Sequence, residues 1–409
     1  MFNKLLHNLI DGRHRFRHMT FDELSELYTS MMFRSLAMSM AGIFIPIFLY
    51  QRGYEVWEIM SFYAVVFGVQ FVCTYPVARL IAWIGPKHTI LISYILQVIT
   101  MAGLINIVLL PSHLIIAVLF GMANIAFFES FHINFSKVKH RRSSGSEVGW
   151  MFITERTGAI LGPLLGGLVA FLFAPEYTFF VSVCLLLFAS LPLFLTQEQI
   201  KLNQRVDFSK LNVKKIKHDL VSYSGLTVEN VVAVVVWPLF LGMIVLANNP
   251  YLQLGSIMTV SILVSLFVAR AMGKIVDNRR GRTLLRVSAA ANGLLHLFRP
   301  FTGGYPMALA VNAVNDGVTP GYRMPFLKGF YDAADDHPGS RIVYVAIMEF
   351  AATLARAMFF ATAAVAAYLM TVDRIFFGLL FLVGAICSFI IMKERFRALN
   401  APKRRIHAK

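Results

Sequence analysis

The segment that decides the fold is GWMFITERTGAILGPLLGG, residues 149–167. It is apolar enough to cross a bilayer, yet Glu155 and Arg156 stand side by side in it, and Pro163 follows within a series of glycines. Charges are costly on a helix that faces lipid, and a proline removes a backbone hydrogen bond. The combination therefore predicts a membrane helix whose charged side chains face the protein interior.

The composition of the whole chain agrees with a membrane protein. Of the 409 residues, 57% are hydrophobic and only 15% are charged, which is too apolar for an ordinary soluble protein. A helix of about 20 apolar residues crosses the roughly 30 Å of hydrocarbon in a bilayer. Twelve runs of this kind predict an all-α integral membrane protein with 12 transmembrane helices.

The distribution of charge predicts the orientation in the membrane. The chain has 38 Lys and Arg residues, and when the loops are assigned alternately to the two sides, one side holds only Arg52, Arg299 and Arg374. Since positive charge collects on the cytoplasmic side, both termini should be cytoplasmic in a multi-pass plasma or inner membrane protein. The net charge of +16 is then a topology signal, and it requires no nucleic-acid partner.

The first 27 residues are basic and contain no apolar core of the signal-peptide type. Five apolar residues recur there at helical spacing beside the sequence HRFRH, and they are Phe2, Leu5, Leu6, Leu9 and Ile10. This pattern fits either an amphipathic helix on anionic lipid or an ordinary solvated tail.

The predicted helices divide evenly around the polar segment QEQIKLNQRVDFSKLNVKKIKHDL. The same offset in sequence maps Glu155 to Glu349 and Glu129 to Arg323, as expected of an internal repeat. We therefore expect two pseudo-symmetric six-helix bundles. The predicted boundaries are a tail at 1–27, a bundle at 28–197, a cytoplasmic linker at 198–221, a bundle at 222–397 and a basic tail at 398–409.

Hairpin geometry predicts partners for the charges within the helices. In an antiparallel pair of helices, residues equally far from the turn lie at one depth. Around Asp336 this rule pairs Arg323 with Glu349, and Asp316 with Arg356. Such pairs are either structural clamps or transport elements, because buried charges need a partner in both cases.

The same rule around Arg142 brings together Glu129, Glu155 and Arg156. Two acids that share one arginine cannot both be comfortably ionised, so this cluster is the predicted proton site. Arg34 has no acid in register and is the leading candidate for contact with an anionic substrate, as opposed to snorkelling or pairing with Glu129. Glu229 and Arg270 are expected to gate or snorkel near the helix ends.

No pattern points to an enzyme, a metal or a cofactor. The sequence lacks the GxxxxGK[ST], HExxH and GxSxG patterns, and its cysteines, Cys73, Cys184 and Cys387, have no metal-ligand spacing. Ion gradients, most simply of protons, or substrate gradients are left as the source of energy.

The glycines of the opening segment form the pattern G-x8-G-x3-GP-x2-GG. Its members are Gly149, Gly158, Gly162, Pro163, Gly166 and Gly167. The pattern resembles the fifth-helix signature of the major facilitator superfamily, best known in its proton-driven exporters. The segment GKIVDNRRGR resembles the loop pattern of that family through Gly273, Asp277, Gly281 and Arg282, although it has one extra residue. The matching loop of the first half keeps Gly85 and Lys87 but has Ala78 and Ala82 where glycine and aspartate are expected.

The resemblance implies a fold in which helices 1, 4, 7 and 10 line a central cavity while helices 2, 5, 8 and 11 pack across the interface between the halves. Two sets of site residues are then expected. The substrate-binding set is Arg34, Glu129, Asp316, Arg323 and Arg356. The proton-coupling set is Glu129, Glu155, Arg156 and Glu349.

We expect a secondary active transporter that works by alternating access, as a monomer, and exports a small amphipathic or anionic solute by proton-coupled antiport. Uptake by symport, or flipping of a lipid-linked anion in the same fold, is the alternative. A membrane scaffold or sensor that transports nothing is a third interpretation. Anionic lipid is expected near the basic cytoplasmic loops.

Overall fold

The computed structural model describes residues 23–107, 113–138, 144–195, 206–208, 211–246, 249–275, 281–336 and 340–399. Within these ranges every regular element is helical. The predicted amphipathic segment near the N-terminus and most of the predicted basic C-terminal tail lie outside the described residues.

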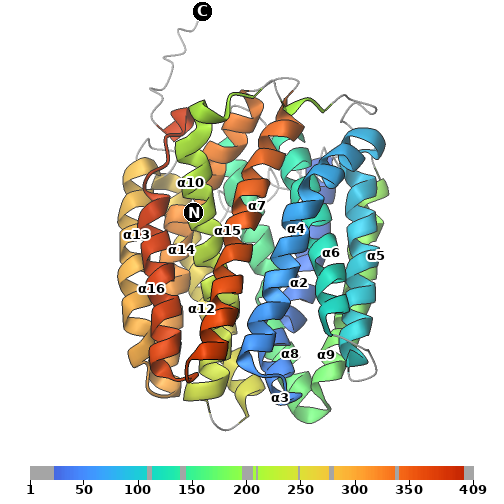
Figure 1. Cartoon of the computed structure of the whole chain (residues 1–409). Helices are drawn as coiled ribbons and strands as arrows, with labels where there is room; N and C mark the ends of the chain where they lie inside the picture. Colours follow the sequence, from blue (N-terminus) through green and yellow to red (C-terminus); the bar gives the residue numbers. More distant parts are fainter. Residues whose placement is uncertain are drawn as a thin grey trace, which may run out of the picture.

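The N-terminal half runs up and down through antiparallel helices (Figure 1). Its elements are α2 (Glu23–Ala41), α3 (Ile45–Gln51), α4 (Val56–Ile84), α5 (Pro86–Ile105), α6 (His113–Val138), α7 (Ser144–Ala159), α8 (Gly162–Leu172) and α9 (Pro175–Ser190). Short 3₁₀ turns at Gly42–Phe44 and Leu191–Phe194 extend two of these helices.

The C-terminal half repeats the arrangement beside the first (Figure 1). Its elements are α10 (Val213–Val231), α11 (Trp237–Phe240), α12 (Pro250–Ile275), α13 (Gly281–Phe298), α14 (Tyr305–Asp335), α15 (Arg341–Leu369) and α16 (Arg374–Ile391). Three short turns, at Val232–Val236, Leu241–Val245 and Arg299–Phe301, continue α10, α11 and α13.

Ten helices in the described residues are long and apolar enough to cross a membrane. The two long helices beyond these, α13 and α14, run alongside them but hold more polar residues. The membrane-protein prediction is confirmed, whereas ten of the twelve predicted spans meet this measure of length and hydropathy.

Proline explains where several spans change geometry. The helix break between α7 and α8 is followed at once by Pro163, and Pro238 lies between two short π-helical segments that continue α10. Proline cannot donate a backbone hydrogen bond, so the turn before it relaxes into another hydrogen-bond pattern. The fifth predicted span (α7–α8) and the seventh (α10–α11) therefore each continue as one span, although the pattern of backbone hydrogen bonds is interrupted within them.

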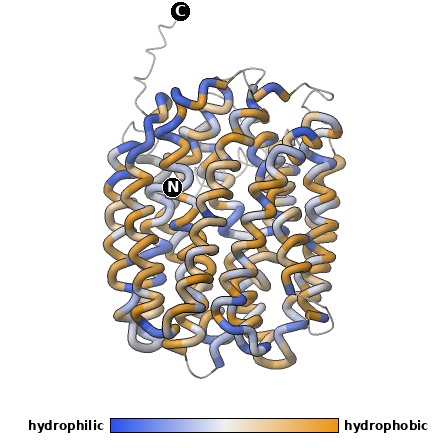
Figure 2. The backbone as a smooth tube through the Cα atoms, viewed as in Figure 1, coloured by the Kyte–Doolittle hydropathy of each residue, from blue (hydrophilic) through white to orange (hydrophobic). Residues whose placement is uncertain are grey.

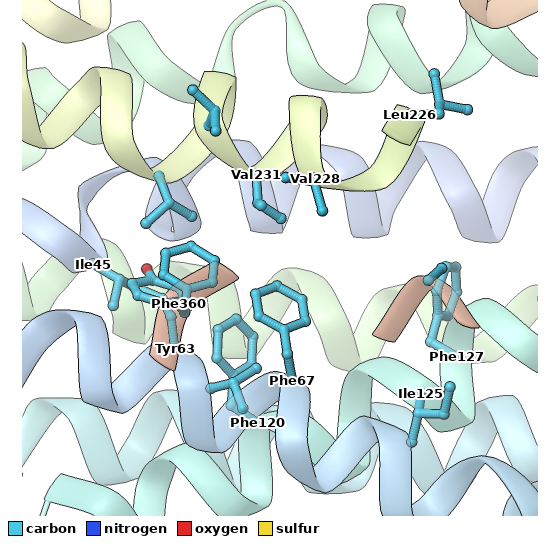
Figure 3. Packing of buried hydrophobic residues seen from close by; sticks show 14 of the residues in the cluster. Ile45, Tyr63, Phe67, Phe120, Ile125, Phe127, Leu226, Val228, Val231 and Phe360 are labelled. Atoms are coloured by element: carbon cyan, nitrogen blue, oxygen red, sulfur yellow. The ribbon is translucent and has the colours of Figure 1, made fainter. Parts of the chain in front are cut away.

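The two halves meet mainly along two helix pairs, α4 with α15 and α7–α8 with α12. Aromatic rings fill the first contact, where Phe360 stacks on Tyr63 at 5.2 Å and on Phe67 at 5.5 Å between ring centroids (Figure 3). These are the helices numbered 2, 5, 8 and 11 in the predicted order, so their expected place at the interface is confirmed.

Large apolar side chains are exposed on the outer helices α5, α9, α13 and α16. Figure 2 shows hydrophobic residues along the length of the helices and hydrophilic residues gathered toward the two ends. A large exposed apolar surface of this kind marks contact with lipid.

Two helices begin earlier than the predicted boundaries. Helix α2 begins at Glu23, within the predicted tail, and α10 begins at Val213, within the predicted linker. The side chain of Asn212 caps α10 by accepting a hydrogen bond from the backbone N–H of Lys214 at 3.1 Å. The polar composition of these stretches concealed the helices because an exposed first turn needs caps more than apolar residues.

Candidate functional site

Two ion pairs join the N-terminal and C-terminal halves. Glu155 of α7 faces Arg323 of α14, with 3.3 Å between Oε1 and the nearer guanidinium nitrogen. Arg156, the residue after Glu155, lies 3.7 Å from the carboxylate of Asp316, which is on α14 like Arg323. Because α7 belongs to the N-terminal half and α14 to the C-terminal half, each pair resists separation of the halves.

An aromatic ring lies against both arginines of these pairs. Phe152, one turn before Arg156 on α7, is fully buried and packs with Met324. The guanidinium carbons of Arg156 and Arg323 lie 5.2 Å and 5.9 Å from the ring centroid. The ring attracts both cations and keeps water from one side of the pairs, which strengthens the attraction.

A second polar cluster centres on Glu349 of α15. Its carboxylate accepts a hydrogen bond from the Tyr223 hydroxyl at 2.5 Å and lies 3.5 Å from Arg356 on the same helix. His132 of α6 approaches it at 3.6 Å through Nε2, and the other ring nitrogen lies 2.7 Å from the Tyr331 hydroxyl. His132 therefore links the N-terminal half to two helices of the C-terminal half, α14 and α15.

Glu129 lies one turn before His132 on α6 and is fully buried. Among the residues that the structure describes, neither of its carboxylate oxygens has a hydrogen-bond partner. An ionised carboxylate in this position would bear the full cost of desolvation, whereas a protonated one would not. Glu129 is therefore the acid in this cluster best placed to carry a proton.

Arg34 of α2 is buried without an ion-pair partner in the described part of the chain. Its guanidinium donates a hydrogen bond to the side chain of Asn124 at 3.2 Å and lies 3.7 Å and 4.8 Å from the rings of Phe127 and Phe128. Stacking satisfies the faces of the guanidinium but leaves donors on its edge for an anion.

The predicted partners of four charges are wrong. Arg323 pairs with Glu155 in place of Glu349, and Asp316 pairs with Arg156 in place of Arg356. The hairpin rule failed because α15 packs along α4 and α10 and has little contact with α14, its neighbour in sequence.

The predicted cluster of Glu129, Glu155 and Arg156 is also not formed. Helix α7 packs against α2, α12 and α14, whereas α6 packs against α4 and α5. Glu129 consequently lies apart from the inter-half pairs and close to His132.

The glycines of residues 149–167 contact helices of both halves. A Cβ atom at Gly158 or Gly166 would overlap a backbone carbonyl of α2, and one at Gly162 would overlap the Ser39 side chain of α2, so this stripe packs within one half. A Cβ atom at Gly167 would instead overlap the carbonyl of Tyr251 in α12, across the interface. Gly149 faces Met324 of α14.

Pro163 shares in the contact between halves. Its carbonyl is so close to Gly255 of α12 that no Cβ would fit there, and the next N–H, of Leu164, donates to the Thr259 hydroxyl at 3.1 Å. The signature therefore joins α8 to α12 through backbone groups.

The loop motif is only partly visible. Gly273 lies in the last turns of α12, and Asp277 is outside the described residues. Gly281 begins α13, where Arg282 binds Glu394 through two nitrogens at 2.6 Å and 3.1 Å. In the first half, Lys87 makes the corresponding buried pair with Glu26 at 2.8 Å.

Sequence reasoning missed a buried network in the C-terminal half. Glu229 was expected near a helix end and Arg299 in a polar loop, yet both are buried, and His296 lies between them. The expectation for Glu229 is wrong because α10 begins earlier than predicted, whereas Arg299 does lie in the turn after α13 but its side chain is buried there. The spacing of His296 and Arg299, which places both on one helix face, was the available signal.

Two helical bundles with apolar outer surfaces and charge pairs between them define a membrane transporter of the two-bundle type. The family model for the Major Facilitator Superfamily matches residues 27–319. The chain belongs to that superfamily and is a transporter, not an enzyme. No curated protein gives a significant sequence match.

Solved structures with the same fold cover about nine-tenths of the chain. The human organic anion transporter MFSD10 (TETRAN) has a TM-score of 0.65 at 14% identity, covering 90% of this chain and 98% of that chain. A bacterial homologue of the iron transporter ferroportin, outward-facing with soaked iron, has a TM-score of 0.64 at 12% identity, with 91% and 98% covered. The Escherichia coli fucose:proton symporter FucP has a TM-score of 0.61 at 12% identity, with 90% and 96% covered.

Proposed function

We propose that this transporter exports a small amphipathic or anionic solute by proton-coupled antiport. The observation that carries the proposal is the crosswise pairing of Glu155 with Arg323 and of Arg156 with Asp316 between the halves. In alternating access the halves rock against each other. These pairs must therefore loosen or exchange partners during the cycle.

The pairs supply a physical means of coupling. Separating the partners of such a partly buried ion pair is costly because each charge is then left uncompensated. A proton on a carboxylate or an anion on an arginine replaces the lost partner and lowers that cost. Proton binding and substrate binding then compete for the same conformational step, as antiport requires.

The arginines favour an anion as the substrate. Arg34 is buried without an acidic partner in the described part of the chain, and it lies on two phenylalanine rings. Its edge suits a carboxylate or a phosphate, while Phe127 and Phe128 offer apolar contact for the rest of the molecule. An amphipathic anion satisfies both.

We further propose that both chain termini lie on the cytoplasmic side and that anionic lipid binds there. Lys214, Lys215 and Lys217 are exposed at the start of α10. Exposed lysines beside a membrane attract anionic headgroups.

Transport in proteoliposomes tests the proposal. A thermal-shift screen of amphipathic anions at two pH values first identifies a ligand, because a ligand stabilises the protein that it binds. The labelled ligand is then supplied under an imposed pH gradient. Antiport predicts its accumulation in the acidic compartment, whereas accumulation in the alkaline compartment would show symport. A ligand that binds but does not cross would show a scaffold or sensor.

A further inference from the structure

His132 of α6 is a titratable side chain at the contact between the halves, and the proposed function leaves it unused. Its side chain is only 12% exposed. Rings of both halves surround the imidazole, with centroids 6.3 Å away for Phe128, 6.0 Å for Phe131 and 5.4 Å for Phe330 of α14. Histidine is the side chain whose unperturbed pKa places its charge change between about pH 5 and pH 8. A change of charge on this ring therefore acts on both halves.

The two ring nitrogens of His132 face different groups of the C-terminal half. Nδ1 lies 2.7 Å from the hydroxyl oxygen of Tyr331, which is the length of a formed hydrogen bond. Nε2 lies 3.6 Å from Oε1 of Glu349, which is too long for a hydrogen bond but close enough for an ion pair. A hydroxyl can donate or accept, whereas an ionised carboxylate only accepts. The contact with Glu349 is therefore strongest when the ring is protonated on both nitrogens.

The other partners of Glu349 belong to its own half. Tyr223 of α10 donates to Oε1 at 2.5 Å, and Arg356 of α15 lies 3.5 Å from the other oxygen, Oε2. Both contacts lie within the C-terminal half, so neither of them resists separation of the halves. His132 belongs to the N-terminal half, so a bond from its ring to Glu349 does resist it.

Other titratable groups lie around this contact. Glu129 is one turn before His132 on α6, and it adds no charge while it carries a proton. Arg323 precedes Tyr331 by about two turns on α14, and it is paired with Glu155 of α7, so the effects of these two charges on the ring largely oppose each other. The charge that faces Nε2 directly is the carboxylate of Glu349.

We propose that His132 is a proton-binding residue of the transport cycle, and that a proton on its ring closes an ion pair with Glu349 between the halves. The sign is opposite to that of the Glu155–Arg323 pair, because a proton on Glu155 breaks an ion pair whereas a proton on His132 makes one. This inference rests on the proposed function, in which links between the halves are exchanged during the cycle.

A purely structural role for His132 predicts a different result. A neutral ring that only fills space and holds Tyr331 would affect the contact between the halves equally at every pH. His88 of α5 provides the control, since it is an exposed histidine whose ring packs on Phe194 of the same half.

The test measures the separation of the halves by electron spin resonance without any substrate, at about pH 5 and about pH 8. Spin labels are placed at Lys137→Cys on α6 and Lys217→Cys on α10, both exposed, after the three native cysteines are replaced by alanine. His132→Gln removes the titrating ring. The double variant Glu349→Gln with Arg356→Gln removes the facing charge and leaves no neighbour uncompensated, so it decides the test if His132→Gln does not fold. Melting temperature reports folding.

We expect the change from about pH 8 to about pH 5 to raise the ratio of joined to separated halves about tenfold more in the parent than in either variant. The reason is that an opposite charge within about 4–6 Å changes the proton affinity of a group about tenfold or more. His88→Gln should respond to pH as the parent does.

The inference is overturned if His132→Gln or the double variant keeps the parental response to pH, or if His132→Gln changes the ratio equally at both pH values. A response that persists in His132→Gln but is lost in Glu155→Gln would overturn this inference and leave the proposed function standing. A response that depends on His132, in a protein that proves to be a symporter, would support this inference and overturn the proposed direction of transport.

Discussion

Replacing Glu155 by glutamine tests whether the inter-half ion pair couples protons to transport. Glutamine keeps the shape of the side chain and can still accept a hydrogen bond from Arg323, but it carries no charge and binds no proton. We expect proton-driven accumulation of substrate to fall while exchange of bound substrate continues, because the halves then separate without waiting for a proton.

The structure sets the size of the effect. Unit charges 3.3 Å apart attract by about 5 kcal/mol at an effective dielectric constant of about 20. The side chains of Arg323 and Glu155 are 26% and 20% exposed, so water screens much of this attraction. A net loss of about 1–2 kcal/mol remains, which shifts the balance between joined and separated halves about 5- to 30-fold.

The assay compares two rates in the same proteoliposomes. One is uptake driven by a pH gradient, and the other is counterflow exchange with unlabelled substrate inside and no gradient. Glu394→Gln is the matched control, since it removes an ion pair with Arg282 that lies within the C-terminal half and does not cross between the halves. Equal loss of both rates in Glu155→Gln would show a structural role and refute the reasoning, as would unchanged proton-driven uptake.

Three further predictions concern other residues. Glu129→Gln removes a buried acid whose oxygens have no hydrogen-bond partner in the described residues. The melting temperature of the variant should be unchanged or higher, and uptake driven by a pH gradient should be lost. A marked fall in melting temperature would count against a buried proton site. Gly167→Ala places a methyl group against a backbone carbonyl of α12 and should lower the uptake rate at least tenfold. Gly68→Ala is the control, because Gly68 has open space around it and the uptake rate should not change. Equal uptake rates for the two variants would show that the close contact at Gly167 has no role in transport. Lys87→Met removes the buried hydrogen-bonded ion pair with Glu26 and should lower the free energy of unfolding by about 1.5–3 kcal/mol, as measured by thermal unfolding; an unchanged free energy of unfolding would disagree.

The lengths of the helices and their membrane location could be predicted from sequence. Apolar runs such as Val56–Ile84 and Arg374–Ile391 are long and apolar enough to cross a bilayer. The division into two halves follows from the polar segment that separates the first six predicted spans from the last six. Helices α13 and α14 are the exceptions in hydropathy, because they bury the polar groups that serve the C-terminal half.

The site was predicted as a set of residues but not as a set of contacts. Glu155, Arg156, Asp316 and Arg323 were recognised as charges too deep to face lipid, and all four lie between the halves. Their partners were wrong because hairpin register assumes that helices adjacent in sequence are adjacent in space, an assumption that α15 violates by packing on α4.

The sequence by itself determined that this chain crosses a membrane many times and that its helices bury charged side chains. These features can be read from each segment separately, because every residue on a lipid-facing helix is in contact with the same apolar solvent, in which polar and charged groups are costly. Only the tertiary structure decided that Arg156 holds Asp316 across the interface and that Arg299 reaches Asn315 through the interior. Those pairings depend on which helix faces pack together, and this is fixed by close-packed surfaces from distant parts of the chain.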